Sequence, residues 1–149
     1  GMRVAGAGAA LWRVDPVMGS TVLEAEAIMA IPAGATPQAA EAWGAHLAIL
    51  LLCRSRGNPR ATCVSGDNLA VLRYCASQGR LRHPEVHNIL DSSLARVAAC
   101  GWAVRWQAVR RHANAHADGL ATEVVFFRVA RLARSGAAQP QFRVRGPSA

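Results

Sequence analysis

Apolar and polar residues alternate near the start of the chain, and this alternation predicts a β-hairpin. Over residues 21–31 one set of alternate positions carries Glu24 and Glu26, and the other set is apolar. A period of two residues is typical of a strand with one face toward solvent. Residues 5–14 are glycine-rich and then strand-like, and residues 15–20 (DPVMGS) are turn formers. We therefore expect two antiparallel strands, the second with its acids outward.

The spacing of apolar residues then lengthens, which predicts a helix over about residues 38–54. Thr36 suits the N-cap of this helix, and Pro37 suits its first turn. The segment is rich in large apolar residues, so we expect it to be one of the most buried elements. Glu41 is expected in its first turn, where an acid on a largely apolar helix favours a nearby metal ion or cation.

The rest of the chain is expected to contain short strands and helices. The expected elements are a strand over 61–65, helices over about 69–77 and 85–100, a strand over 104–108, and a helix from 115 to about 134. This order predicts an α/β fold with a mixed sheet and flanking helices. The length of 149 residues predicts one domain over 1–134 and a loose tail over 135–149, in which 142–144 could add a short extended piece.

The charge of the chain indicates a polyanionic partner. All seventeen basic residues are arginine and the net charge is +8, which favours binding to nucleic acid. The four cysteines show no close pairing and no zinc-finger spacing, so we expect buried free thiols in a reducing compartment. No apolar run has the length of a membrane span and no signal peptide is apparent, which predicts an intracellular protein, cytoplasmic or nuclear.

Two further acids lie at the ends of expected elements. Asp67 follows the strand at 61–65, at the carboxyl end where open α/β sheets bind their ligands. Asp118 lies near the start of the last helix, where the helix dipole keeps a carboxylate ionised and suited to a metal ion. The residues suited to contact a nucleic-acid backbone are Asn68, Arg110, Arg111 and Asn114.

The segment from Arg111 to Ala121, RHANAHADGLA, resembles a family signature. It is similar to the last motif of the ribonuclease H domains attached to retroelement reverse transcriptases, which runs roughly R-H-x-N-x-x-A-D-x-L-A. The matching residues are Arg111, His112, Asn114, Ala117, Asp118, Leu120 and Ala121. The resemblance implies a nuclease that hydrolyses the RNA strand of an RNA–DNA hybrid with Mg²⁺ or Mn²⁺.

The same resemblance implies a set of catalytic residues. The family's carboxylates correspond to Glu41, which lies in a T-x-x-x-A-E-x segment, and to Asp67 and Asp118. These acids would hold two magnesium ions roughly 4 Å apart, one to activate water and one to steady the leaving oxygen. His112 corresponds to the family's mobile histidine, which assists proton transfer or product release.

Three alternatives compete with these assignments. Glu26 rivals Glu41, because Glu24-Ala25-Glu26-Ala27 also looks like the motif, although strand alternation continues through it. His112 and His116 are four residues apart and could form a zinc pair. The segment at 104–121 could also be a plain strand leading into an amphipathic helix.

The chain departs from the family at its first strand, which ends in Asp-Gly-Ser or Asp-Gly-Ala and supplies an acid that bridges both metals. That strand is central, so its absence would leave two unpaired strand edges. We expect the gap to be filled by residues 141–145, by a segment exchanged within a homodimer, or by a rearranged sheet. Without the bridging acid we expect weak or absent nuclease activity. The other functional hypotheses are an inactive nucleic-acid-binding remnant and an unrelated α/β domain that binds a small ligand.

Overall fold

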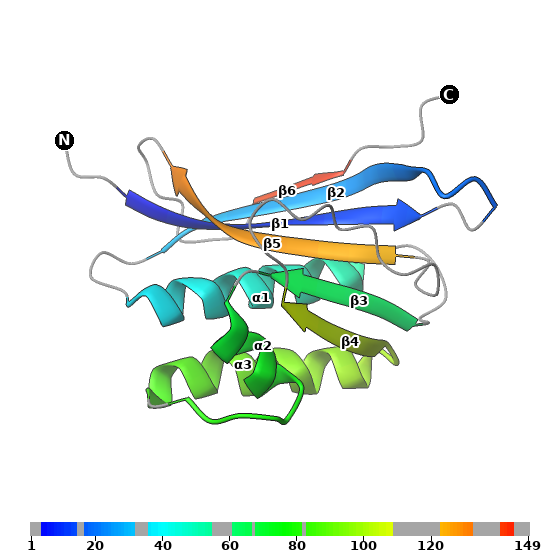
Figure 1. Cartoon of the computed structure of the whole chain (residues 1–149). Coiled ribbons are helices and arrows are strands. Elements are labelled where there is room, and N and C mark those ends of the chain that lie inside the picture. The colour runs from blue at the N-terminus through cyan, green and yellow to red at the C-terminus, as the bar shows by residue number, and fades with distance from the viewer. Residues whose placement is uncertain are drawn as a thin grey trace.

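The chain forms a mixed α/β fold in which helices pack on one sheet (Figure 1). The structure is a computed structural model that describes residues 4–14, 17–31, 36–54, 61–66, 68–81, 83–108, 123–132 and 141–144. Its elements are β1 (Val4–Val14), β2 (Thr21–Ala30), α1 (Pro37–Arg54), β3 (Ala61–Gly66), α2 (Leu69–Cys75), α3 (Pro84–Ala99), β4 (Ala103–Ala108), β5 (Glu123–Leu132) and β6 (Gln141–Val144). The predicted α/β class is confirmed.

The expected hairpin is present as β1 and β2. The two strands pair antiparallel, with a register shift between Leu11 and Trp12. Ala25 and Ala27 are buried in β2, whereas Glu24 and Glu26 are only half-buried. The acids of this strand therefore alternate with buried alanines, as the pattern predicts, although one carboxylate oxygen of Glu24 is itself buried.

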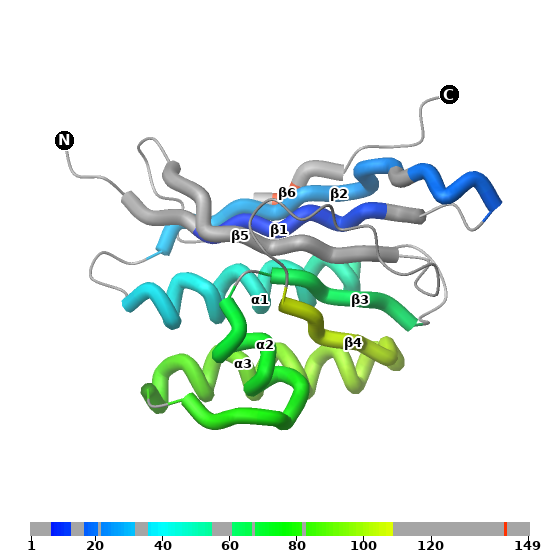
Figure 2. The backbone as a smooth tube through the Cα atoms, viewed as in Figure 1, coloured from blue at the N-terminus to red at the C-terminus, as the bar shows by residue number. Residues whose placement is uncertain are grey.

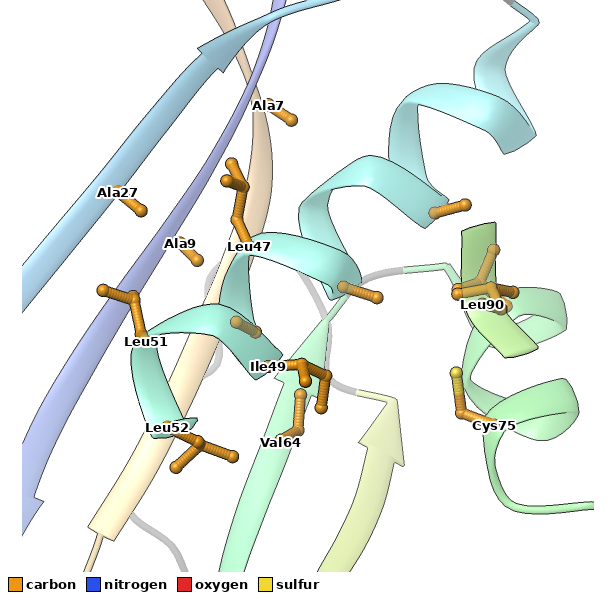
Figure 3. Close-up of a cluster of buried hydrophobic side chains, with 14 of the residues drawn as sticks. Ala7, Ala9, Ala27, Leu47, Ile49, Leu51, Leu52, Val64, Cys75 and Leu90 are labelled. Carbon is orange, nitrogen blue, oxygen red and sulfur yellow. The ribbon is translucent and has the colours of Figure 1, made fainter. Parts of the chain in front are cut away.

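Helix α1 lies at the centre of the core, between the sheet and α3 (Figures 1 and 2). Its start follows the predicted cap, because the Thr36 hydroxyl oxygen accepts a hydrogen bond of 3.1 Å from the Ala39 amide. Leu47 and Leu51 point toward alanines of β1 and β2 (Figure 3). Small strand residues allow the helix to approach the sheet closely, and ten residues of α1 are buried as a result.

The strand order of the sheet is β4-β3-β5-β1-β2-β6. β5 lies between β1 and β3; it is antiparallel to β1, with Ala7 opposite Val129, and parallel to β3, with Ser65 opposite Phe126. The helix predicted from 115 to about 134 is therefore wrong for residues 123–132. The run VVFF consists of β-branched and aromatic residues, which favour a strand, and an empty position between two strand edges stabilises one there.

The gap expected in the sheet is thus filled by a rearranged sheet made from this chain alone. Segment 141–145 does not fill it, because β6 pairs with the other edge of the hairpin, with Phe142 opposite Ala27. The Arg54 guanidinium lies 4.0 Å from the centre of the Phe142 ring and ties β6 to the end of α1. Pairing of the sheet therefore gives no reason for an exchanged segment or a homodimer.

The remaining helices follow their predicted bounds within two residues. α3 begins with Pro84 in its first turn, and Gly101 follows its end with a φ of 81°. A positive φ is readily adopted by glycine, so Gly101 ends the helix at little cost. Among the helices that the structure describes, none is both long and apolar enough to cross a bilayer.

Replacement of Leu47 by alanine is expected to destabilise the domain by about 2–5 kcal/mol. Leu47 is fully buried between α1 and the sheet, so its removal leaves a cavity. Leu50 lies on the same helix and is only half-buried, so Leu50→Ala is the matched control and should cost about 1 kcal/mol. The measurement is urea unfolding followed by circular dichroism. Equal losses for the two variants would contradict this description of the core.

Candidate functional site

The carboxyl ends of β3 and β4 meet at one edge of the domain. The strands are parallel, and their last residues, Gly66 and Ala108, are opposite each other. Asp67 follows Gly66 in the sequence, and Arg110 and Arg111 follow Ala108 after one residue. The register of the two strands therefore places Gly66 and Ala108, the last described residues before these charged segments, side by side. This edge is where an open α/β sheet binds ligands.

Glu41 lies near the start of α1, the helix that begins toward the same edge (Figure 1). α1 and β3 run in opposite directions (Figures 1 and 3), so the early turns of α1 and the carboxyl end of β3 lie toward the same end. Glu41 is half-buried, and it is in the second turn of α1 rather than the first, because the helix begins at Pro37. The rival Glu26 lies within β2, opposite Ala10. Glu41 thus lies on a helix and Glu26 on a strand, and the assignment of Glu41 as a metal ligand stays a prediction.

Asn68 begins α2 directly behind the end of β3. Its side-chain oxygen accepts a hydrogen bond of 3.1 Å from the Val71 amide, and its backbone is extended, as an N-cap requires. The side chain of Asn68 therefore has a structural role in starting α2. The carboxamide group also carries an NH₂ with two donors, the chemistry that a phosphate oxygen would use.

The other predicted site residues lie outside the described part of the chain. They are Asp67, Arg110, Arg111, His112, Asn114 and Asp118, together with His116 of the alternative zinc pair. Whether the three acids converge stays a prediction. Within the described residues there is no group of three or more His, Cys, Asp or Glu side chains that could hold a metal ion. Of the proposed metal ligands, only Glu41 is described.

The end of β3 is held firmly against β4. Residues from Thr62 to Gly66 are all buried, so both faces of β3 are covered. On one face the Cys63 thiol lies 3.4 Å from the side-chain oxygen of Gln107 in β4, to which it donates. The carboxyl end of β3 is therefore well packed, which suits an element that positions a ligand-binding group.

A histidine that the sequence did not single out joins α1 to α3. Nδ1 of His46 lies 2.8 Å from the Ser93 hydroxyl, which in turn donates to the Ile89 carbonyl at 2.9 Å. Since that hydroxyl hydrogen is used, Nδ1 carries the proton and donates to Ser93. Burial, and then the Arg96 guanidinium, hold the pKa of His46 below its ordinary value of 6.5. His46 is therefore a structural histidine kept neutral at pH 7.

Two cysteines that are far apart in the sequence meet at the opposite end of α1. Their sulfur atoms, Sγ of Cys53 and Sγ of Cys100, are 3.0 Å apart. The four cysteines are free thiols as expected, but only Cys63 and Cys75 are buried, while Cys53 and Cys100 are half-buried. Burial, followed by the hydrogen bond from Cys100, raises the pKa of Cys53 to about 12. This pair could not be recognised in the sequence, because its members are 47 positions apart.

Exposed arginines supply the positive charge of the described surface. They are Arg54, Arg73, Arg80, Arg96 and Arg105. Arg73 lies on α2, and Arg80 lies in the segment that follows this helix. This distribution suits a polyanion. Comparison of the chain with protein-family models, with curated proteins and with solved structures finds no match.

The neutral state of His46 predicts a specific loss of stability in acid. The unfolded chain takes up a proton near pH 6.5, but the folded chain resists it because the folded pKa is lower. The contribution of His46 is therefore fully present above pH 6.5 and is lost as the pH falls below that value. The free energy of unfolding should fall less between pH 7 and 5 in a His46→Asn variant than in the parent. An identical pH dependence for both proteins would contradict the assignment.

Proposed function

We propose that this chain is a ribonuclease H-like, nucleic-acid-binding domain that binds RNA–DNA hybrids and hydrolyses them weakly or not at all. The observation that carries the proposal is the strand order of the sheet. In the ribonuclease H fold the first strand is central, between the strand that opens the hairpin and the strand after the first helix. β5 has that position here, and it is antiparallel to β1 and parallel to β3.

The order of the elements before β5 supports the same family. A hairpin, a helix, a strand, further helices and another strand follow one another from β1 to β4, as they do after the family's first strand. The matching motif at 111–121 comes directly after β4. The domain therefore combines the family's order of elements with a central strand taken from later in the chain, in the manner of a retroelement remnant.

The sequence of β5 is the reason to propose weak activity. The family's central strand supplies the acid that bridges two metal ions. β5 reads EVVFFRVARL, and its one acid, Glu123, is at the amino end. The carboxyl end of β3 lies beyond Ser65, which is opposite Phe126, and from there on β5 contains Arg128 and Arg131 instead of an acid. The sequence of β5 therefore supplies no acid for a metal ion beyond Glu123, and its arginines add to the positive charge of the chain, which favours a phosphate.

Hydrolysis is the second candidate function, and the position of Glu41 favours it. Glu41 on α1 and the carboxyl end of β3, which Asp67 follows, lie toward the same end of the domain. With Asp118, these acids would hold Mg²⁺ or Mn²⁺, which supplies an activated water and stabilises charge on the leaving oxygen. His112 would then assist proton transfer. Three carboxylates without a bridging acid are expected to hold two ions poorly.

Binding to an RNA–DNA hybrid is expected to be tight at low salt and to weaken by about 100-fold between 50 and 200 mM salt. The arginine-rich loops neutralise phosphates, and counterion release makes the affinity depend on salt. An Arg110→Ala, Arg111→Ala double variant should reduce the slope of log affinity against log salt by about two. Arg96→Ala is the matched control, since Arg96 is exposed on α3 beside the other end of α1.

Fluorescence anisotropy with a labelled hybrid measures this dependence. No binding at low salt, or a slope that both sets of variants change equally, would contradict the proposed binding site. Equal binding of single-stranded RNA would point to a different kind of nucleic-acid partner.

Cleavage of the same hybrid by the purified chain is expected to be weak or undetectable with Mg²⁺ or Mn²⁺. The assay compares the parent with a Glu41→Gln, Asp67→Asn double variant on a gel. Binding without cleavage in both proteins supports the leading proposal. Strong cleavage by the parent that the double variant loses would establish the nuclease and overturn the proposed inactivity.

A further inference from the structure

The end of α1 and the end of α3 bring two thiols into contact. Cys53 is the penultimate residue of α1, and Cys100 is the C-cap residue of α3. Their sulfur atoms are 3.0 Å apart, and both residues are half-buried. We propose that Cys53 and Cys100 form a reversible disulfide, so that this end of the domain is an oxidation-sensitive site.

The geometry suits a bond between these two sulfurs. A disulfide needs a sulfur–sulfur distance of about 2.05 Å, so the atoms must approach by about 1 Å. Both sulfurs lie at helix ends, where a change of side-chain rotamer and a small shift of the last turn are enough. Oxidation therefore needs no rearrangement of the sheet or of the site end of α1.

The other two cysteines, Cys63 and Cys75, are much less accessible to an oxidant. Cys63 is 1% exposed and donates to Gln107, and Cys75 is 6% exposed within α2. Both thiols are therefore shielded from a dissolved oxidant, whereas half-buried thiols can be reached. The raised pKa of Cys53 keeps it protonated at neutral pH, so its thiolate forms only transiently and oxidation of the pair is expected to be slow.

The reaction is balanced with hydrogen peroxide as the oxidant. The thiolate of one cysteine attacks a peroxide oxygen, the O–O bond breaks, and a sulfenic acid and one water form. The second thiolate then attacks the sulfenic sulfur, the S–O bond breaks, and a second water leaves. Two electrons pass from the sulfur pair to the peroxide, and a dithiol reductant reverses the change.

The bond would fasten α1 to α3 at the end of the domain away from Glu41. It closes a loop of 48 residues, which contains β3, α2 and α3. Closing a loop of this length reduces the freedom of the unfolded chain, so the oxidised form should unfold at a higher temperature, by roughly 5–15 °C.

The test is oxidation of the full chain with hydrogen peroxide, followed by mass spectrometry without reduction. The expected product is a monomer that has lost two hydrogen atoms and yields one linked peptide pair containing Cys53 and Cys100. Its melting temperature should rise and should return to the starting value with dithiothreitol. Cys53→Ser and Cys100→Ser should each abolish the linked peptide, and Cys75→Ala is the control that should retain it.

Mapping the thiols of the parent keeps the test decisive if a serine variant fails to fold. Iodoacetamide added before and after oxidation should show that Cys53 and Cys100 become protected together. Bonds that mainly join two molecules, links to Cys63 or Cys75, or over-oxidation of Cys53 and Cys100 without a link would each overturn the proposal.

Discussion

Two strand edges that must find a partner determine the structure of this domain. The hairpin β1–β2 and the parallel pair β3–β4 each end in backbone amides and carbonyls that would be buried and unpaired without another strand. β5 satisfies both edges at once, with one antiparallel and one parallel ladder. The sheet becomes continuous, and α1 can then pack across the join, in contact with β1, β2 and β5.

The backbone pairing of β5 and the chemistry of its side chains place different demands on the sequence. A central strand can be replaced by any segment with the right backbone and suitable apolar residues, because a ladder of hydrogen bonds does not depend on side chains. A catalytic carboxylate cannot be replaced in this way. β5 restores the pairing, but its sequence beyond Phe126 contains two arginines and no acid. The pairing of a sheet and the charges that its strands carry can therefore be determined independently of each other.

The parts of the fold governed by local rules could be predicted from the sequence. The alternation in 21–31, the Thr36 cap and the Pro84 start each depend on neighbouring residues, and each element was predicted within two residues of its bounds. The strand β5 could not be predicted from its own sequence, because the alanine-rich segment before it extends a helical pattern. Its antiparallel pairing partner, β1, lies over 100 positions earlier in the chain. The Cys53–Cys100 contact was missed for the same reason.

The position of the candidate site stays a prediction from the sequence, because most of its residues lie outside the described part of the chain. Strand ends and helix starts are recognisable in sequence, so the edge beyond Gly66 and Ala108 was a natural expectation. Asn68 looked like a phosphate ligand, and the structure shows that it caps α2. A short polar residue before a helix serves either purpose, and only the hydrogen bond to Val71 identifies the cap.

The central position of β5 also affects how the chain reaches its native state. During synthesis β1 to β4 leave the ribosome well before residue 132. The β1–β2 hairpin and the β3–β4 pair therefore keep unpaired edges until β5, the strand that joins them, has been made. Contacts between β1 and β5 span more than 110 residues, which gives the domain a high contact order and predicts slow folding. A nascent chain that pauses before β5 would expose two unpaired strand edges, which can pair with other chains and cause aggregation. The yield of folded protein in a cell should therefore depend on chaperones that shield these edges.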